Sequence, residues 1–324
     1  MQTEFTTAAD ERVQRWVARI WYEMPREIYF GKFMKDDPNA IIEVKRDLEG
    51  QPGDKLNYSL ANKLSGAGVT NDDTLEGSEE ELDVDTDSVT LVQKRNAVRL
   101  KGRMSMKRTA FNQEEVAKDR LKTWLAETVD DGIFTELASS PTTSVFGGSA
   151  TSVATLAAAG LITPAKIDSM IAKAKKADPK IWPVRVDGDD HYVLVMHTDC
   201  GFDLRQNSTW QGYQQNGAQK QGRDNPIFSG MFGIYNNTVL HEHEKVPAAL
   251  TGGSGGDVPY AVNLFLGRQA AVYASGMKPQ AWTKEFDYGA SLGFAIGAIW
   301  NVRKAIFAGV DHGVIAGQFA RTNN

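Results

Sequence analysis

The sequence predicts an α+β protein, and three features carry that prediction. Residues 112–138 hold apolar residues at helical spacing for about seven turns, the longest such run in the chain. Residues 55–64 and 92–107 alternate apolar and polar residues with the period of two of a half-buried strand. Between these strands, residues 71–87 read NDDTLEGSEEELDVDTD, with nine carboxylates and no Lys or Arg. A long helix beside separate runs of strands is typical of the α+β class.

Length and composition exclude several classes of protein. The 324 residues are 41% hydrophobic and 24% charged, which allows one large core or two modest ones. No apolar run approaches the roughly 18 residues of a membrane span, and the N-terminus lacks a signal-peptide pattern, so we expect a cytoplasmic chain with no membrane partner. The single cysteine, Cys200, excludes an intrachain disulfide and a multi-cysteine metal site. A pI near 5.6 argues against a dedicated duplex-DNA reader.

The N-terminal 40 residues are expected to form an arm rather than a domain. Apolar residues at steps of three and four predict a helix over residues 8–24, which Pro25 ends, and its apolar face includes Trp16 and Trp21. The following stretches, residues 26–34 and 39–48, are aromatic and then β-branched, and they favour extended structure. A helix without a domain of its own should bury its apolar face against a neighbouring subunit.

Residues 53–110 are expected to form a projecting β-hairpin. Its two amphipathic strands are joined by more than 20 residues, and a structureless connection of that length inside a compact domain is uncommon unless it has a function outside it.

The charges of this hairpin change sign along its second strand. The odd-numbered face of residues 81–107 is acidic at first and basic afterwards, and residues 94–108 hold seven basic residues and no acid. On a straight strand the two blocks lie roughly 50 Å apart, far beyond the Debye length of about 8 Å. A second copy of the chain would complement both blocks. The charge blocks therefore predict as inter-subunit residues Asp72, Asp73, Glu76, Glu79, Glu80, Glu81, Asp83, Arg95, Arg99, Arg103 and Lys107. The arm adds Trp16 and Trp21 to this set.

The acidic run has two other interpretations. It could be a solvated loop with no partner. It could also be a calcium loop with Asp72 first, Glu76 fifth and Gly77 sixth, but Thr74 then stands where an Asp or Asn is wanted, and Asp83 replaces the bidentate Glu.

The second half of the chain is expected to be rich in strands. Thr163-Pro164 opens a second helix that ends at Asp178-Pro179, with Ile162 and Ile167 placed as a hydrophobic staple. Residues 139–160, just before it, are small, polar and glycine-rich, and are expected to be mobile or loosely packed. Strands follow from YVLVMH onward, interrupted by a short helix near residues 204–215, and two final strands are predicted within residues 294–307 and 313–319.

HEHE at residues 241–244 is the one candidate metal motif. In a strand, His241 and His243 share a face and could bind zinc together. A β-barrel site of this type would want a glutamate about four residues later, and that position is Pro247. A polar strand edge is the alternative interpretation, and we expect no metal and no cofactor.

Several segments together resemble a known family. YFGKFM, KLSGAGVTNDDTLEGSEEEL, QKRNAVRLKGRMSMKRT, DNPIFSGMFGIYNN and FAIGAIWNVRKAIF occur in this order in a family of tailed-bacteriophage and prophage major capsid proteins. The resemblance runs from about residue 10 to the end of the chain. It implies the Hong Kong 97-type phage capsid fold, an α+β fold with an N-terminal arm, an extended hairpin called the E-loop, a peripheral domain with a long spine helix, and an axial domain.

The resemblance also implies how the chain divides. The arm would be residues 1–40, and the peripheral domain residues 41–52 and 111–189 with the spine helix at 112–138. The E-loop would be 53–110 and the axial domain 190–290, and residues 291–324 would return to the peripheral domain.

By this resemblance the chain is a non-enzymatic major capsid protein of a virion. Its copies would form hexamers and pentamers of an icosahedral shell around double-stranded DNA, assembled in the bacterial host cytoplasm with a portal protein. Helical spacing begins at once near Val13, without a long scaffold segment, so a separate scaffolding protein is expected. No Lys-Asn pair for crosslinking is identifiable, so buried area, charge and a decoration protein would strengthen the shell. The alternatives are an encapsulin-like compartment shell and a metal-dependent enzyme that uses His241 and His243.

Overall fold

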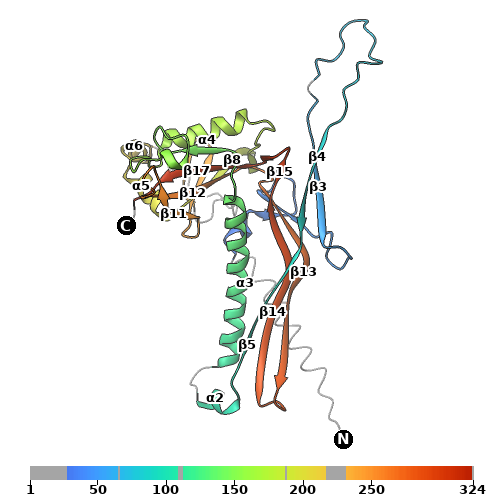
Figure 1. Cartoon of the computed structure of the whole chain (residues 1–324), viewed down its shortest axis with the longest axis vertical. Helices are drawn as coiled ribbons and strands as arrows, with labels where there is room; N and C mark the ends of the chain where they lie inside the picture. The colour runs from blue at the N-terminus through green and yellow to red at the C-terminus, as the bar shows by residue number, and fades with distance from the viewer. Residues whose placement is uncertain (1–27, 65, 109–111, 187, 217–230, 323–324) are drawn as a thin grey trace.

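The long strands of a five-stranded sheet run down the lower part of the molecule, below the projecting hairpin (Figure 1). The computed structural model describes residues 28–64, 66–108, 112–186, 188–216 and 231–322. The strand order is β1 (Met34–Lys35), β2 (Ile42–Lys45), β13 (Ala271–Phe286), β14 (Ser291–Lys304) and β5 (Val92–Arg99). The long strands β13 and β14 form an antiparallel hairpin, and β5 pairs antiparallel with β14 at the edge of the sheet.

The predicted long helix is confirmed as α3 (Gln113–Ala138), which packs along β14. The Asn112 side chain accepts a hydrogen bond from the backbone N–H of Glu114 and so caps the first turn. Apolar residues four positions apart form the buried stripe of the helix: Leu121, Leu125, Val129, Ile133 and Leu137. Alternate residues of β14 face this stripe: Phe294, Ile296, Ala298, Trp300 and Val302.

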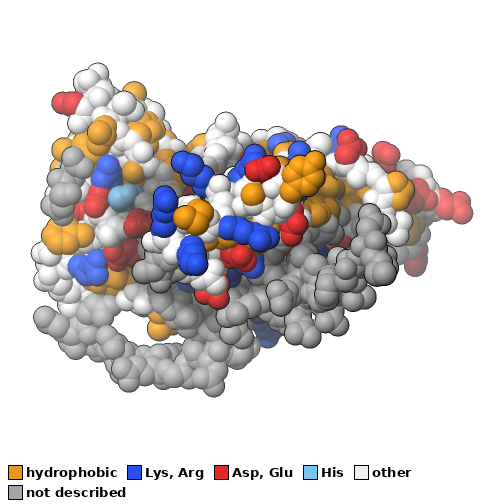
Figure 2. Space-filling view, turned by 90° about the horizontal axis from the view of Figure 1, so that it is seen from below, with side chains coloured by type: hydrophobic (Ala, Val, Ile, Leu, Met, Phe, Trp, Pro, Cys, Tyr) orange, Lys and Arg blue, Asp and Glu red, His pale blue; other side chains and the backbone are white. Residues whose placement is uncertain are grey.

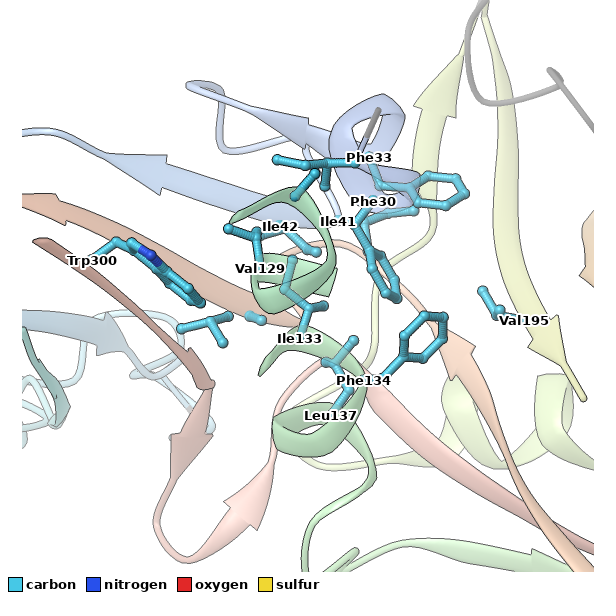
Figure 3. Packing of buried hydrophobic residues seen from close by; sticks show 14 of the residues in the cluster. Phe30, Phe33, Ile41, Ile42, Val129, Ile133, Phe134, Leu137, Val195 and Trp300 are labelled. Atoms are coloured by element: carbon cyan, nitrogen blue, oxygen red, sulfur yellow. The ribbon is translucent and has the colours of Figure 1, made fainter. Parts of the chain in front are cut away.

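The first hydrophobic core lies where α3 meets the N-terminal segment and both sheets. In Figure 3 the rings of Phe30 and Phe134 lie against one another, and their centroids are 4.7 Å apart. The carboxylate of Asp130 on α3 accepts hydrogen bonds from the N–H groups of Tyr29 and Phe30, which open the short 3-10 helix η1 (Tyr29–Phe33). This contact makes η1 helical, whereas the sequence predicted an extended chain there.

An eight-stranded sheet forms the second layer of the molecule. Its order is β6 (Ser144–Phe146), β17 (Val314–Ala320), β12 (Val258–Leu266), β8 (Asp189–Met196), β10 (Thr238–Glu242) and β9 (Met231–Tyr235), with β11 (Ala248–Gly252) on β12 and β7 (Val184–Val186) on β8. A second core lies between this sheet and the helices α4 (Pro164–Lys176), α5 (Thr198–Gln206) and α6 (Ser208–Asn216). The predicted helix after Thr163 is thus confirmed as α4, with Ile162 and Ile167 both buried.

The projecting hairpin exists, but its second strand is not the predicted one. β3 (Lys55–Ala61) pairs with β4 (Val84–Thr90), and Leu91 separates β4 from β5, which pairs with β14 instead. The chain therefore changes its pairing partner at Leu91 while remaining extended. Alternation of apolar and polar residues predicts which face of the sheet each side chain lies on, but it does not predict which strand pairs with this one.

The second predicted strand is also shorter than expected. β5 ends at Arg99, Gly102 follows with a φ of +140°, and Arg103–Arg108 form the helix α2. A left-handed glycine breaks the strand, and Arg, Met and Lys favour a helix after it. Arg103 and Lys107 therefore lie on a helix, not on the strand that holds Arg95 and Arg99.

In the last third of the chain, the long strands are divided between the two large sheets. β13 lies within the predicted 190–290 segment but belongs to the five-stranded sheet, whereas β17 follows residue 291 but lies in the eight-stranded sheet. Between them β15 (Ile306–Phe307) and β16 (Val310–Asp311) form a small two-stranded sheet. Within this last third the chain crosses between the two large sheets twice, from β12 to β13 and from β14 to β17, which strand patterns alone do not reveal.

Residues 139–160 are more closely packed than their composition suggested. They include β6 and the 3-10 turn η2 (Val153–Thr155). A Cβ added to Gly147 would lie 1.8 Å from the carbonyl oxygen of Gly160, so the two backbone segments touch at this point. The small residues allow this close approach, and the prediction of loose packing is wrong here.

Candidate assembly surfaces

The acidic surface is the loop beyond the paired part of the hairpin, residues 62–83. Its predicted carboxylates are all exposed: Asp72, Asp73, Glu76, Glu79, Glu80, Glu81 and Asp83. Some of them also order the loop, since Glu79 accepts a hydrogen bond from the N–H of Gly77 at 2.6 Å, and Asp83 accepts one from the side-chain amide of Asn62 at 2.8 Å. The carboxylates thus sit on a loop with internal hydrogen bonds.

Large apolar side chains are exposed on the same loop. Leu64, Leu75 and Leu82 are 61%, 59% and 65% exposed. These leucines add apolar side chains to a surface that is otherwise rich in carboxylates. The acidic loop is therefore suited to a partner with both basic and apolar groups.

A groove with that chemistry lies on β5. It has a volume of about 490 Å³ and is lined by Gln93, Arg95, Ala97, Val98, Arg99, Trp282, Lys284, Phe286, Gly293, Phe294 and Ala295. We call it the β5 groove. Trp282, Ala295 and Ala97 are aligned across the strands, and Trp282 is 40% exposed. Basic side chains of Arg95, Arg99 and Lys284 complete the lining.

Two of the basic side chains, Arg99 and Arg103, are fixed by contacts with the β13–β14 hairpin. Arg99 donates to the hydroxyl of Ser291 at 3.2 Å, and its guanidinium lies over the ring of Phe286, 4.2 Å from the centroid. Arg103 donates to the carbonyl oxygen of Gly289 at 3.2 Å. Arg95, Arg99, Arg103 and Lys107 are all exposed. Their charges are therefore presented at defined positions.

The two surfaces lie toward opposite ends of the molecule. In Figure 1 the hairpin projects at the top, whereas β5 leads to α2 at the bottom. Seen from below, Lys and Arg side chains gather near the middle of the face with apolar side chains between them, and carboxylates dominate its right edge (Figure 2). The structure thus brings Arg95 and Arg99 together in one groove, with Arg103 and Lys107 on the helix that follows, and separates all four from the acidic loop.

Sequence reasoning did not distinguish Asp87 from the other carboxylates of the acidic run. It closes the acidic run, yet its side chain is only 11% exposed and bonds within the molecule. The only signal is its position opposite Tyr58, which requires the strand register to be known.

The two candidate metal ligands occupy an aromatic cluster. His241 is fully buried, and its Nδ1 lies 3.2 Å from the ammonium of Lys32. The His243 ring lies between Tyr29 and Phe134, at 4.2 and 5.0 Å, and burial lowers the pKa of His243. Across the described ranges, no group of three or more His, Cys, Asp or Glu side chains could hold a metal ion. His241 and His243 instead pack between the N-terminal segment, α3 and β10.

Trp16 and Trp21 lie outside the described residues, so the predicted arm helix has no structural account. No helix in the described part of the chain is long and apolar enough to cross a membrane.

Comparisons with known proteins agree with one another. The model of a phage capsid protein family matches residues 5–144 and 139–319. The major capsid protein of Pseudomonas phage KPP25 is 26% identical over 366 positions, which cover 97% of this chain and 96% of that protein. The capsid of Ralstonia phage GP4 has a TM-score of 0.84 and 33% identity, covering 91% of this chain and 92% of that one. The capsid asymmetric unit of cyanophage Pam1 has a TM-score of 0.81 and 25% identity, covering 92% and 93%.

Proposed function

The chain belongs to the phage capsid protein family, and from this membership we propose that its copies assemble into the hexamers and pentamers of an icosahedral head that encloses double-stranded DNA. Its fold is the Hong Kong 97-type fold of tailed-phage capsids. Its relatives are structural capsid proteins, and its place is the shell of the virion. Assembly in the host cytoplasm, with a portal protein, a separate scaffolding protein and a decoration protein, is part of the proposal.

One observation carries the proposal of how copies join: the acidic loop and the β5 groove complement one another and cannot meet within one molecule. Asp83 and Arg99 lie on an almost continuous extended chain, which places them about 50 Å apart at 3.3 Å per residue. Salt screens exposed charges beyond about 8 Å. The acidic loop of one copy therefore meets the β5 groove and α2 of a second copy.

Apolar contact supplies part of the affinity. Exposed ion pairs contribute only about 0 to 1 kcal/mol each, whereas burial of a leucine side chain contributes roughly 1.5–3 kcal/mol. Leu75 and Leu82 of the loop are the side chains available for this, and Trp282 is the exposed apolar surface of the groove. The charges then steer the loop into register.

The enclosed genome need not be held tightly by the shell. The chain carries a net charge of -5, and tight DNA binding needs many basic contacts with phosphates. We propose that the DNA is confined rather than bound, which lets it leave the head.

Electron microscopy of the purified chain, expressed alone and with its scaffolding protein, tests the proposal. Shells or rings of capsomers are the expected result, and a monomer under both conditions would contradict it.

A substitution tests the groove itself. Trp282→Ala should reduce the initial assembly rate at least several-fold. Trp182→Ala is the matched control, because Trp182 is 49% exposed and lies outside the β5 groove. Equal assembly rates of the two variants would remove the groove from the proposed interface.

A further inference from the structure

Asp87 lies where the projecting hairpin joins the body of the molecule. Its Oδ2 accepts hydrogen bonds from the hydroxyl of Tyr58 at 2.8 Å and from the backbone N–H of Ile306 at 3.2 Å. Its Oδ1 forms an ion pair with Arg303 at 3.5 Å and accepts a bond from the N–H of Ser88 at 2.7 Å. One carboxylate thus joins both strands of the hairpin to β14 and β15.

The ring of Tyr58 reinforces this junction. It meets the ring of Phe307 edge-on, with centroids 5.9 Å apart. Burial and the hydrogen bond to Asp87 raise the pKa of Tyr58, so the hydroxyl stays protonated and donates at physiological pH. The junction therefore combines a directional hydrogen bond with an aromatic contact.

The segment around Ile306, which donates a hydrogen bond to Asp87, is itself bonded to the end of α3. Lys304, two residues before Ile306, is buried and pairs with Asp311 at 2.8 Å. Its ammonium also donates to the carbonyl oxygen of Ser139 at 2.5 Å, and its backbone N–H donates to the Glu136 carboxylate at 3.2 Å. A continuous series of bonds thus runs from the hairpin to the last turn of α3.

We propose that Asp87 is the positioning residue that sets the direction of the hairpin relative to α3. The acidic loop lies up to about 36 Å beyond it, the reach of the 11 residues from Asp87 to Glu76 at 3.3 Å each. A tilt of about 10° at the base would displace that loop by about 6 Å, close to the Debye length over which its charges act. A small change in the angle of the hairpin at Asp87 would therefore move the acidic loop away from the basic groups of a second copy.

The consequence for assembly rests on the proposed function, but the positioning itself can be measured without it. Spin labels at Thr70→Cys on the loop and Thr135→Cys on α3 report the distance between hairpin and helix by double electron–electron resonance. Both sites are exposed, and Cys200 is buried. The measurement uses the full chain at a concentration where it is unassembled.

Asp87→Ala should at least double the width of the distance distribution, and Tyr58→Phe should broaden it less. Asp87→Asn keeps one carbonyl acceptor, but its NH2 group faces donors on the other side, so it should restore the narrow distribution only in part. Asp85→Ala is the matched control, because Asp85 has the same charge but accepts from Asn62 inside the hairpin. An unchanged distribution in both Asp87→Ala and Tyr58→Phe would overturn the proposal.

The assembly rate separates this proposal from the proposed function. Asp87→Ala should assemble at least ten times more slowly than Asp85→Ala, although both lose one negative charge, and Asp87→Asn should recover part of the rate. A broadened distribution with a normal rate would leave Asp87 as the positioning residue and contradict docking through the loop. If Asp87→Ala does not fold, the comparison of Tyr58→Phe with Asp85→Ala tests the same junction.

Discussion

Residues with the same charge have very different surroundings in this chain. Glu79 and Asp87 belong to one acidic run, yet the first is exposed on a loop and the second is bonded to residues of three other strands, β3, β14 and β15. Lys304 and Lys278 differ in the same way, since the side chain of Lys304 is 1% exposed and that of Lys278 is 55% exposed. Charge alone therefore does not indicate what an ionic residue contributes.

Lys304→Met should lower the free energy of unfolding by about 3–5 kcal/mol, because it leaves the buried carboxylate of Asp311 without its partner. Urea denaturation of the unassembled chain measures this. Lys278→Met is the control: it removes an exposed pair with Glu49 and should change the free energy by about 1 kcal/mol at most. Similar losses in both variants would show that the buried pair contributes no more than a surface pair.

At the scale of elements, the sequence predicts best those helices and strands that are determined by interactions between residues close in the chain. α3 follows from its capping residue Asn112 and its apolar spacing, and α4 from Thr163-Pro164. β3 follows from alternation, since Leu56, Tyr58 and Leu60 are more buried than their neighbours. These signals need only residues a few positions apart.

Pairing between distant segments could not be predicted in this way. β5 has the same alternation whether it pairs with β3 or β14, and contact with β14 depends on residues about 200 positions later. The helical conformation of η1 depends on Asp130, a hundred residues away. For the same reason the acidic and basic blocks were recognised, but the groove that holds Arg95 beside Trp282 was not.

The loop between α3 and α4 offers a test of close backbone packing. Gly147→Ala should destabilise the chain by about 1–3 kcal/mol, because the new methyl group would collide with the Gly160 carbonyl and force the backbone to shift. Gly212→Ala in α6 is the control, since no described atom lies within 4 Å of its added Cβ. Alanine there should be neutral or stabilise by up to about 1 kcal/mol. Thermal unfolding of the two variants distinguishes the outcomes.

The proposed role of the charged blocks is tested best by mixing variants. Reversing Glu79, Glu80, Glu81 and Asp83 to Lys should slow or abolish assembly, and reversing Arg95, Arg99 and Arg103 to Glu should do the same. The mixture of the two proteins should assemble, because each supplies the block that the other has lost. Light scattering at low salt follows all three samples. Normal assembly of both single-block variants would leave the acidic run as a solvated loop.

At the scale of the whole molecule, stability should depend on pH through histidines that are buried or half-buried. Burial lowers the pKa of His197, His243 and His312 below the ordinary value of 6.5. Below about pH 6.5 the unfolded chain takes up protons that the folded chain resists, so stability is present above that pH and declines below it. Each histidine contributes at most about 1.4 kcal/mol per pH unit.

Urea denaturation of the unassembled chain at pH 7.5 and 5.5 should show this loss. His312→Gln should reduce the difference between the two pH values, whatever it does to stability at pH 7.5. A difference that remains the same in this variant would assign the pH dependence to other groups.

The predicted N-terminal arm is the other feature that we propose acts in the whole assembly. If its tryptophans bury against a neighbouring subunit, each contributes on the order of 3 kcal/mol, the usual cost of truncating a large core residue. The Trp16→Ala, Trp21→Ala double variant should then be a folded monomer that assembles poorly, as sedimentation and circular dichroism would show. Normal shells from this variant would refute the arm assignment.

The change of partner at Leu91 has a mechanical consequence. β4 and β5 follow one another along almost the same line, so a pull on the hairpin is passed directly into β5. β5 is joined to β14 along its whole length, from Val92 opposite Trp300 to Arg99 opposite Gly293. Bonds perpendicular to the strands resist such a pull in shear, all at once, rather than opening one after another. If neighbouring molecules pull on the hairpin as proposed, the entire ladder therefore carries that tension.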